Sequence, residues 1–109
     1  MNFNYNQIEA TSIENFKGGE KHIDAQMFFD GQTRILRARL IPGASIGLHT
    51  HETDSEVIYI ISGEGSVILD GEKTKVTANC SHYCPKGHTH TLINDSKEDL
   101  QFFAVISKQ

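Results

Sequence analysis

Residues 43–63 read GASIGLHTHETDSEVIYIISG and combine two histidines, a glutamate and a run of β-branched residues. His49 and His51 are two residues apart, so on a strand both imidazoles point to the same face. Imidazole is also the commonest metal ligand among side chains. Glu56 opens the apolar run Val57–Ile61, where a carboxylate is poorly placed unless something binds it. The stretch therefore predicts a polar site built by these three side chains at the mouth of a strand.

A fourth candidate ligand comes from a later part of the chain. His90 follows the turn sequence Pro85-Lys86-Gly87 and begins a short strand pattern that ends before Asn94. Each local feature also has a plain structural interpretation. A His-x-His pair on a strand is often solvated or hydrogen-bonded, and Pro-x-Gly is often only a turn.

Strand patterns continue on both sides of this stretch, with Gly, Asp, Asn and Ser between them. The strands expected are His22–Phe29, Arg34–Ile41, Ser45–His49, Glu56–Ile61, Ser66–Leu69, Lys73–Thr77, Cys80–Cys84, Thr89–Ile93 and Leu100–Ser107. Residues 21–109 are thus expected to form one all-β domain, either a closed barrel or a two-sheet sandwich. Residues 1–20 are expected to form an N-terminal arm, in which Asn6–Phe16 is a strand, a turn of helix or a segment swapped between subunits.

Composition excludes several classes of function. The chain has 109 residues and a formal net charge of −4, and its charges are scattered, so nucleic acid is not an expected partner. No apolar run approaches the roughly 18 residues that a membrane-spanning helix needs. The first residues lack the basic and then apolar order of a secretory signal, so a cytoplasmic location is expected. Cys80 and Cys84 lie about 13 Å apart on an extended strand, too far for a disulfide.

Taken together, these features resemble the two short motifs of the cupin superfamily. Gly43, the His49-Thr50-His51 triplet, Glu56 and Gly63 stand at the spacing of the first motif. The residues that stand at the spacing of the second motif are Pro85, Gly87, His90 and Asn94. Asn79 stands where the second motif usually opens with glycine, and asparagine tolerates the left-handed backbone region that such a turn uses. The resemblance covers residues 43–94, about half of the chain.

The resemblance implies a jelly-roll-like antiparallel β-barrel whose interior holds one divalent transition metal ion. His49, His51, Glu56 and His90 are then the metal ligands. Three imidazoles and one carboxylate leave open coordination positions and suit Fe, Mn, Co, Ni or Cu, or Zn in four-coordinate geometry. The alternative is a closed site that only holds the mouth of the barrel together.

Two further residues are candidates for contacts with a substrate. His88 is two residues before His90 and on an extended strand shares its face; the alternative is an exposed loop histidine. Arg39 alternates with Leu36, Ala38 and Leu40 along a predicted strand. If Arg39 faces the pocket it favours an anionic substrate, and if it faces water it has no role in the site.

The sequence leaves two functions open. One is a metal-dependent enzyme, such as a dioxygenase, isomerase, decarboxylase or lyase, acting on a small organic metabolite. The other is a module that binds or senses a metal or small molecule without turnover. Because Val57–Ile61 and Phe102–Ile106 are apolar on both faces, we also expect a homodimer that covers one of these strands, with the N-terminal segment crossing over. The alternative is that Asn6–Phe16 folds back over its own barrel as the cover.

Overall fold

The structure is a computed structural model that describes residues 1–109, and it consists of strands and one short 3-10 turn. The elements in chain order are β1 (Thr11–Glu14), η1 (Phe16–Gly18), β2 (His22–Phe29), β3 (Thr33–Leu40), β4 (Ser45–Thr50), β5 (Asp54–Ser62), β6 (Glu64–Leu69), β7 (Glu72–Thr77), β8 (Ser81–Cys84), β9 (Thr89–Ile93) and β10 (Leu100–Lys108). Nothing helical in the chain has the length and apolar character needed to cross a membrane.

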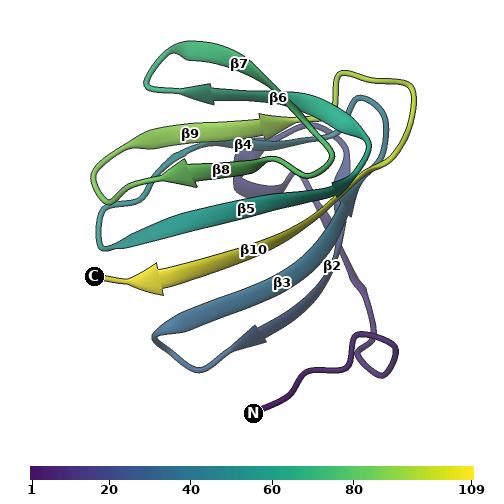
Figure 1. The fold of residues 1–109 in the computed structure, drawn as a ribbon, viewed down its shortest axis with the longest axis vertical. Coiled ribbons are helices and arrows are strands. Elements are labelled where there is room, and N and C mark those ends of the chain that lie inside the picture. The colour runs from purple at the N-terminus through teal and green to yellow at the C-terminus, as the bar shows by residue number, and fades with distance from the viewer.

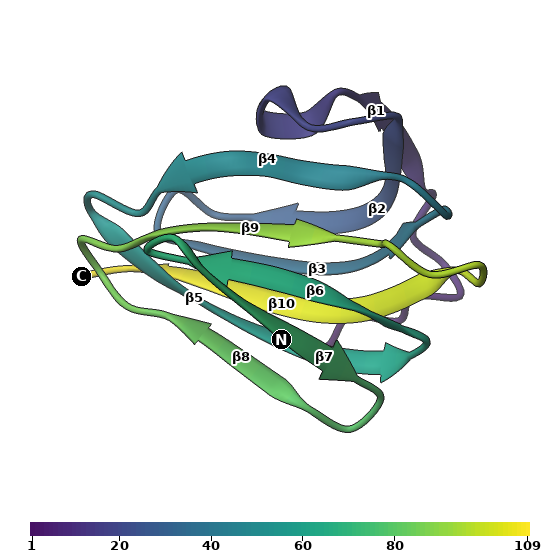
Figure 2. The same cartoon turned by 90° about the horizontal axis from the view of Figure 1, so that it is seen from above.

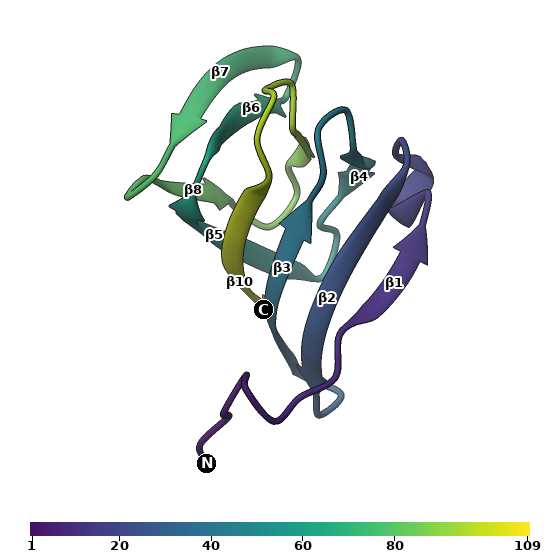
Figure 3. The same ribbon diagram turned by 90° about the vertical axis from the view of Figure 1, so that its right-hand side faces the viewer.

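The strands form two antiparallel sheets that face each other (Figures 1, 2 and 3). The larger sheet has the order β1-β2-β3-β10-β5-β8, and the smaller has the order β4-β9-β6-β7. Strands adjacent in the sheets are often distant in sequence, as where β10 lies between β3 and β5. This jelly-roll arrangement confirms the all-β cupin-type fold expected from the sequence.

Side chains alternate between the core and the outside along β5. Ile58 and Ile60 are almost fully buried, whereas Val57, Tyr59 and Ile61 are each about two-fifths exposed, at 43, 39 and 37%. Since residues of one parity share a face of a strand, Glu56 must point inward with Ile58. The Glu56 side chain therefore lies on the same face of the sheet as the apolar core.

The N-terminal residues pack against the larger sheet of the same chain. Thr11–Glu14 forms β1, which pairs with β2, and the segment before it crosses the outer face of the sheet. There the Phe3 ring lies 4.5 Å from the Phe28 ring, and the Tyr5 ring lies 6.2 Å from the Phe103 ring. This cover reaches β2 and β10 but leaves the outer side chains of β5 exposed.

The turn before β8 contains a residue with a positive φ angle, Asn79. Asn79 adopts φ of 72°, in the left-handed region that asparagine tolerates. Its side-chain oxygen accepts a hydrogen bond of 2.7 Å from the Tyr59 hydroxyl. Asparagine therefore serves where the second cupin motif usually has glycine.

The two cysteines do not form a disulfide. Cys84 is buried, and both Cys84 and Cys80 are free thiols.

Candidate metal centre

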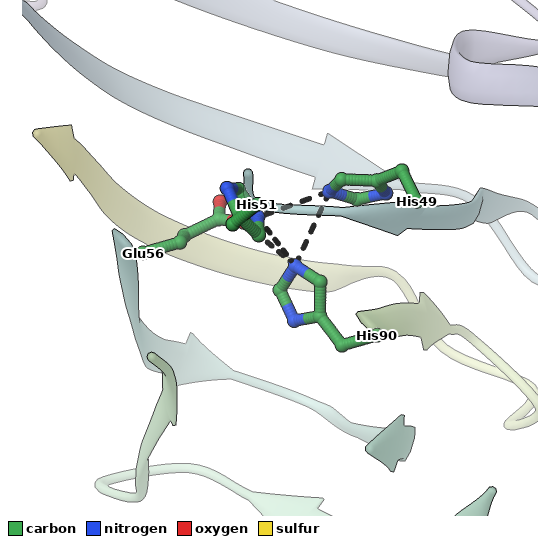
Figure 4. Close-up of side chains that lie close together, drawn as sticks. All are labelled: His49, His51, Glu56 and His90. Carbon is green, nitrogen blue, oxygen red and sulfur yellow. Dashed lines mark hydrogen bonds and ion pairs between the residues drawn. The ribbon is translucent and has the colours of Figure 1, made fainter. Parts of the chain in front are cut away.

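Four polar side chains meet inside the barrel, and they come from both sheets (Figure 4). His49 lies on β4 and His90 on β9 of the smaller sheet, Glu56 lies on β5 of the larger sheet, and His51 lies in the link between β4 and β5. Their ligand atoms all lie within 4.8 Å of one another. His51, Glu56 and His90 are at least 95% buried, and His49 is half-buried. The structure thus brings together all four ligands predicted from the sequence.

The distances within the cluster match those between ligands of a shared ion. Glu56 Oε1 lies 2.9 Å from His90 Nε2, 3.1 Å from His51 Nε2 and 4.0 Å from His49 Nε2. His90 Nε2 lies 2.9 Å from His51 Nε2 and 3.2 Å from His49 Nε2. Two ligand atoms at right angles and about 2.1 Å from a metal are about 3.0 Å apart. The donor set therefore fits a small divalent ion.

Each histidine is held by its second ring nitrogen, which leaves Nε2 for the centre. His49 Nδ1 donates to the Gly47 carbonyl at 2.7 Å, and His51 Nδ1 donates to Asp54 Oδ1 at 2.6 Å. His90 Nδ1 lies 3.0 Å from His82 Nε2. Such supporting bonds fix the tautomer and the orientation of metal-binding imidazoles. With Nδ1 protonated, each Nε2 is the nitrogen that can give a lone pair to a metal ion once the ion displaces any proton there.

Two of these supporting groups were missed in the sequence. His82 was not among the candidate site residues; it is buried and pairs across the sheet with the inward residue Ile58. Its position in β8 gives the signal: His82 and Cys84 alternate with exposed Ser81 and Tyr83. Asp54 was not among the candidates either, although it lies only three residues after His51.

The electrostatics of the metal-free cluster favour an ionised carboxylate. Burial acts to raise the pKa of Glu56, but hydrogen bonds from His51 and His90 outweigh it and lower that pKa to about 2. Contact with Glu56, and then with Asp54, raises the pKa of His51. Burial lowers the pKa of His49. At neutral pH the cluster therefore offers a charged oxygen and imidazoles whose protons a metal ion can displace.

A cavity of about 370 Å³ adjoins the cluster, and His49, His51 and Glu56 form part of its wall. The apolar part of the wall is Phe16, Met27, Phe29, Leu36, Ile46 and Ile106. Arg34 also lines the cavity, although sequence reasoning did not single it out. The alternation of side chains along β3 could have indicated this position, because Arg34 lies two residues before the buried Leu36 and so shares its face of the strand.

The other two sequence candidates lie away from this cavity. Arg39 is on the outer face of β3, where it forms ion pairs with Asp24 at 2.6 Å and Asp99 at 3.6 Å. Arg39 points outward because it alternates along β3 with the buried residues Leu36, Ala38 and Leu40, which point inward. His88 lies in the loop before β9, about half exposed, and pairs with Asp70 at 2.5 Å. Neither residue contributes to the cavity wall next to the cluster.

Comparisons with known proteins agree with this architecture. A family model described as "Cupin domain" matches residues 36–106. The chain is 31% identical over 106 residues to the "Oxalate-binding protein" of Thermotoga maritima, covering 92% of this chain and 88% of that protein. The crystal structure of a "predicted oxalate decarboxylase" from Thermotoga maritima superposes with a TM-score of 0.93 at 30% identity and full coverage of both chains.

A more distant neighbour shows the fold alone. An RmlC-like cupin from Shewanella frigidimarina has a TM-score of 0.80 at 22% identity, with 100% of this chain and 90% of that one covered. The family model spans more than half of the chain, and the motif histidines and glutamate converge inside the barrel as the motifs require. On these grounds the chain belongs to the cupin family.

Proposed function

We propose that this protein binds one divalent transition metal ion through His49, His51, Glu56 and His90, and that the ion holds a small organic acid for reaction. The observation that carries the proposal is the convergence of three Nε2 atoms and one carboxylate oxygen beside a cavity. Fe, Mn, Co, Ni, Cu and Zn all suit this ligand set. When bound, such an ion polarises a coordinated carboxylate and lowers the pKa of coordinated water.

The chain's own residues supply positioning and a partly dry site. Gly47, Asp54 and His82 hold the three imidazoles in place, so little reorganisation is needed when a ligand arrives. The apolar wall of the cavity displaces water from the space next to Glu56 and strengthens electrostatic interactions there.

An organic acid is the favoured ligand for two reasons. Three cationic side chains, Lys17, Arg34 and Lys108, line the cavity. The relative with 31% identity is named for oxalate binding, and the structure with 30% identity is named as a predicted oxalate decarboxylase. The second candidate function is binding without turnover, which the name of the first relative favours.

The first experiment is metal analysis. Protein stripped with EDTA and reconstituted with Mn²⁺ or Zn²⁺ should retain about one ion per chain after desalting, by the four-ligand set described above. A His49→Ala/His51→Ala double variant should retain none. A wild-type protein without metal, or a double variant with full metal, would contradict the proposal.

The second experiment separates an enzyme from a binding module. Calorimetric titration with oxalate should give heat for the metal-loaded protein and none for the stripped protein. Release of carbon dioxide or formate from the loaded protein would identify a reaction, and binding without release under aerobic conditions would favour the module. Equal binding to the stripped protein would remove the metal from the proposal.

A further inference from the structure

The three cations that line the cavity form no ion pair with an acidic residue. Arg39 pairs with Asp24 and Asp99 on the outer face, whereas none of the ion pairs in the structure involves Arg34, Lys17 or Lys108. The Arg34 guanidinium instead lies 4.5 Å from the centre of the Phe29 ring, and its Nη1 lies 3.5 Å from the Met27 sulfur. A guanidinium in apolar surroundings retains its capacity for an anion.

Acidic residues of the cavity do not neutralise Arg34 either. Glu56 belongs to the metal cluster, and Asp54 is bonded to His51. Glu52, the remaining acidic residue of the wall, is exposed and forms no ion pair. The free charge of the cavity, once a divalent ion is bound, is therefore positive.

Strand register separates Arg34 from the metal cluster by a fixed distance. On the larger sheet Ile106 of β10 is paired with Arg34 on one side and with Glu56 on the other. Neighbouring strands lie about 4.8 Å apart, so the backbones at Arg34 and Glu56 are about 10 Å apart with Ile106 between them. Phe29, over which the guanidinium lies, is paired with Arg34 from the far side. The arginine head therefore points away from the cluster, across an apolar residue.

The opposite wall is held in place by close backbone packing. The turn with Phe16 and Lys17 rests on β4 at Gly47, where an added Cβ would lie 2.0 Å from the Lys17 carbonyl oxygen. Gly19 approaches β4 equally closely, since its Cβ would lie 2.0 Å from the Ser45 carbonyl oxygen. These contacts leave no room for the turn to shift toward β4. Phe16 and Lys17 therefore form a part of the cavity wall that is packed directly against β4.

We propose that Arg34 is the residue that selects the ligand, and that the ligand is an organic diacid longer than oxalate. One carboxylate binds the metal ion, an apolar segment lies over Ile106, and the second carboxylate pairs with the Arg34 guanidinium. Oxalate, the shortest diacid, occupies the metal but does not reach across Ile106. This inference rests on the proposed function, because it requires the metal to hold the first carboxylate.

The test uses Zn²⁺-loaded protein, since zinc has no redox chemistry and binding is measured without turnover. Calorimetry with oxalate, malonate, succinate, glutarate and adipate should show an affinity maximum at a diacid longer than malonate. Valerate, which has the chain of glutarate but one carboxylate, should bind about tenfold or more weakly than glutarate, by the loss of one charge-assisted pair.

Variants assign the effect to one side chain. Arg34→Met should weaken the preferred diacid about tenfold or more and change oxalate affinity less than about threefold. Arg37→Met is the matched control, because Arg37 is exposed on the outer face of the same strand, and it should change neither. Arg34→Gln provides a polar variant if the methionine variant does not fold.

The outcomes separate this inference from the proposed function. Absence of zinc or of any diacid binding in the wild type overturns both. Tightest binding of oxalate, or an equal effect of Arg34→Met on all five acids, overturns the role of Arg34 alone and leaves the metal centre standing. A length preference lost in the Arg34 variants and kept in the Arg37 variant supports the inference.

Discussion

Replacing Glu56 by glutamine tests the energetics of the buried cluster in the metal-free protein. Glutamine has nearly the shape of protonated glutamic acid, so the substitution removes the charge and keeps the volume. The pKa of Glu56 is lowered from its ordinary value of 4.5 to about 2 by its bonds to His51 and His90. A depression of this size corresponds to about 3 kcal/mol of folding stability, at about 1.36 kcal/mol per pKa unit.

The sign of the shift sets the pH range of the effect. A depressed carboxyl pKa stabilises the fold above 4.5, and this contribution is lost as the pH falls through about 2. The same contact raises the pKa of His51 above its ordinary value of 6.5. The stabilisation that comes from protonated His51 is therefore fully present below pH 6.5 and is lost as the pH rises through the raised pKa. Both shifts describe one interaction and are not added. It is therefore strongest near pH 6, where both groups are charged.

Urea denaturation in EDTA measures the effect. At pH 6 we expect Glu56→Gln to lower the free energy of unfolding by about 3 kcal/mol, and the difference should shrink below pH 4.5 and vanish near pH 2. Glu52→Gln, at an exposed glutamate of the same cavity, should change it by less than about 0.5 kcal/mol at any pH. A Glu56→Gln penalty that is the same at pH 6 and at pH 3 would refute the ion-pair explanation. It would leave packing as the cause.

Three other predictions concern the surroundings of the site and the outer face. His82→Phe should keep one metal ion per chain but weaken metal affinity about 10–100-fold in a competition titration, because the bond from His90 Nδ1 is lost. Gly47→Ala should lower the urea midpoint measurably, since its Cβ would clash with the Lys17 carbonyl oxygen; an unchanged midpoint would contradict the close packing of that turn. Light scattering after size exclusion should give about twice the 12.2 kDa chain mass, and Tyr59→Glu should halve it; a wild-type mass near 12 kDa would end the dimer proposal.

The fold could be predicted closely from the sequence because its strands are short and well punctuated. Each of the nine expected strands is present, with ends that differ by at most two residues. The metal cluster was also predictable, since the spacing of its four residues is a property of the chain itself. The strand Thr11–Glu14 was left among several alternatives because its residues are mostly exposed and show no clear alternation.

The environment of the cluster could not be predicted in the same way. His82 reaches His90 only because β8 pairs with β5, a long-range pairing that local patterns do not encode. Arg34 illustrates a different limit. Its parity on β3 was readable, but it lies at the end of the strand, where the buried positions give way to half-buried ones. Only the pairing of β3 with β10, and of β10 with β5, shows that its backbone lies across Ile106 from Glu56.

The position of the cavity also bears on the choice between an open and a closed metal site. A closed structural site would have its ligands surrounded by protein, with no space for a further molecule at the ion. Here His90 is enclosed, whereas His49, His51 and Glu56 face the cavity from one side. Burying a carboxylate and three imidazoles in an apolar core has a cost that a purely structural barrel avoids by using aliphatic residues. Because the barrel retains these groups and leaves a cavity beside them, the geometry favours the open site of the proposed function over a closed structural one.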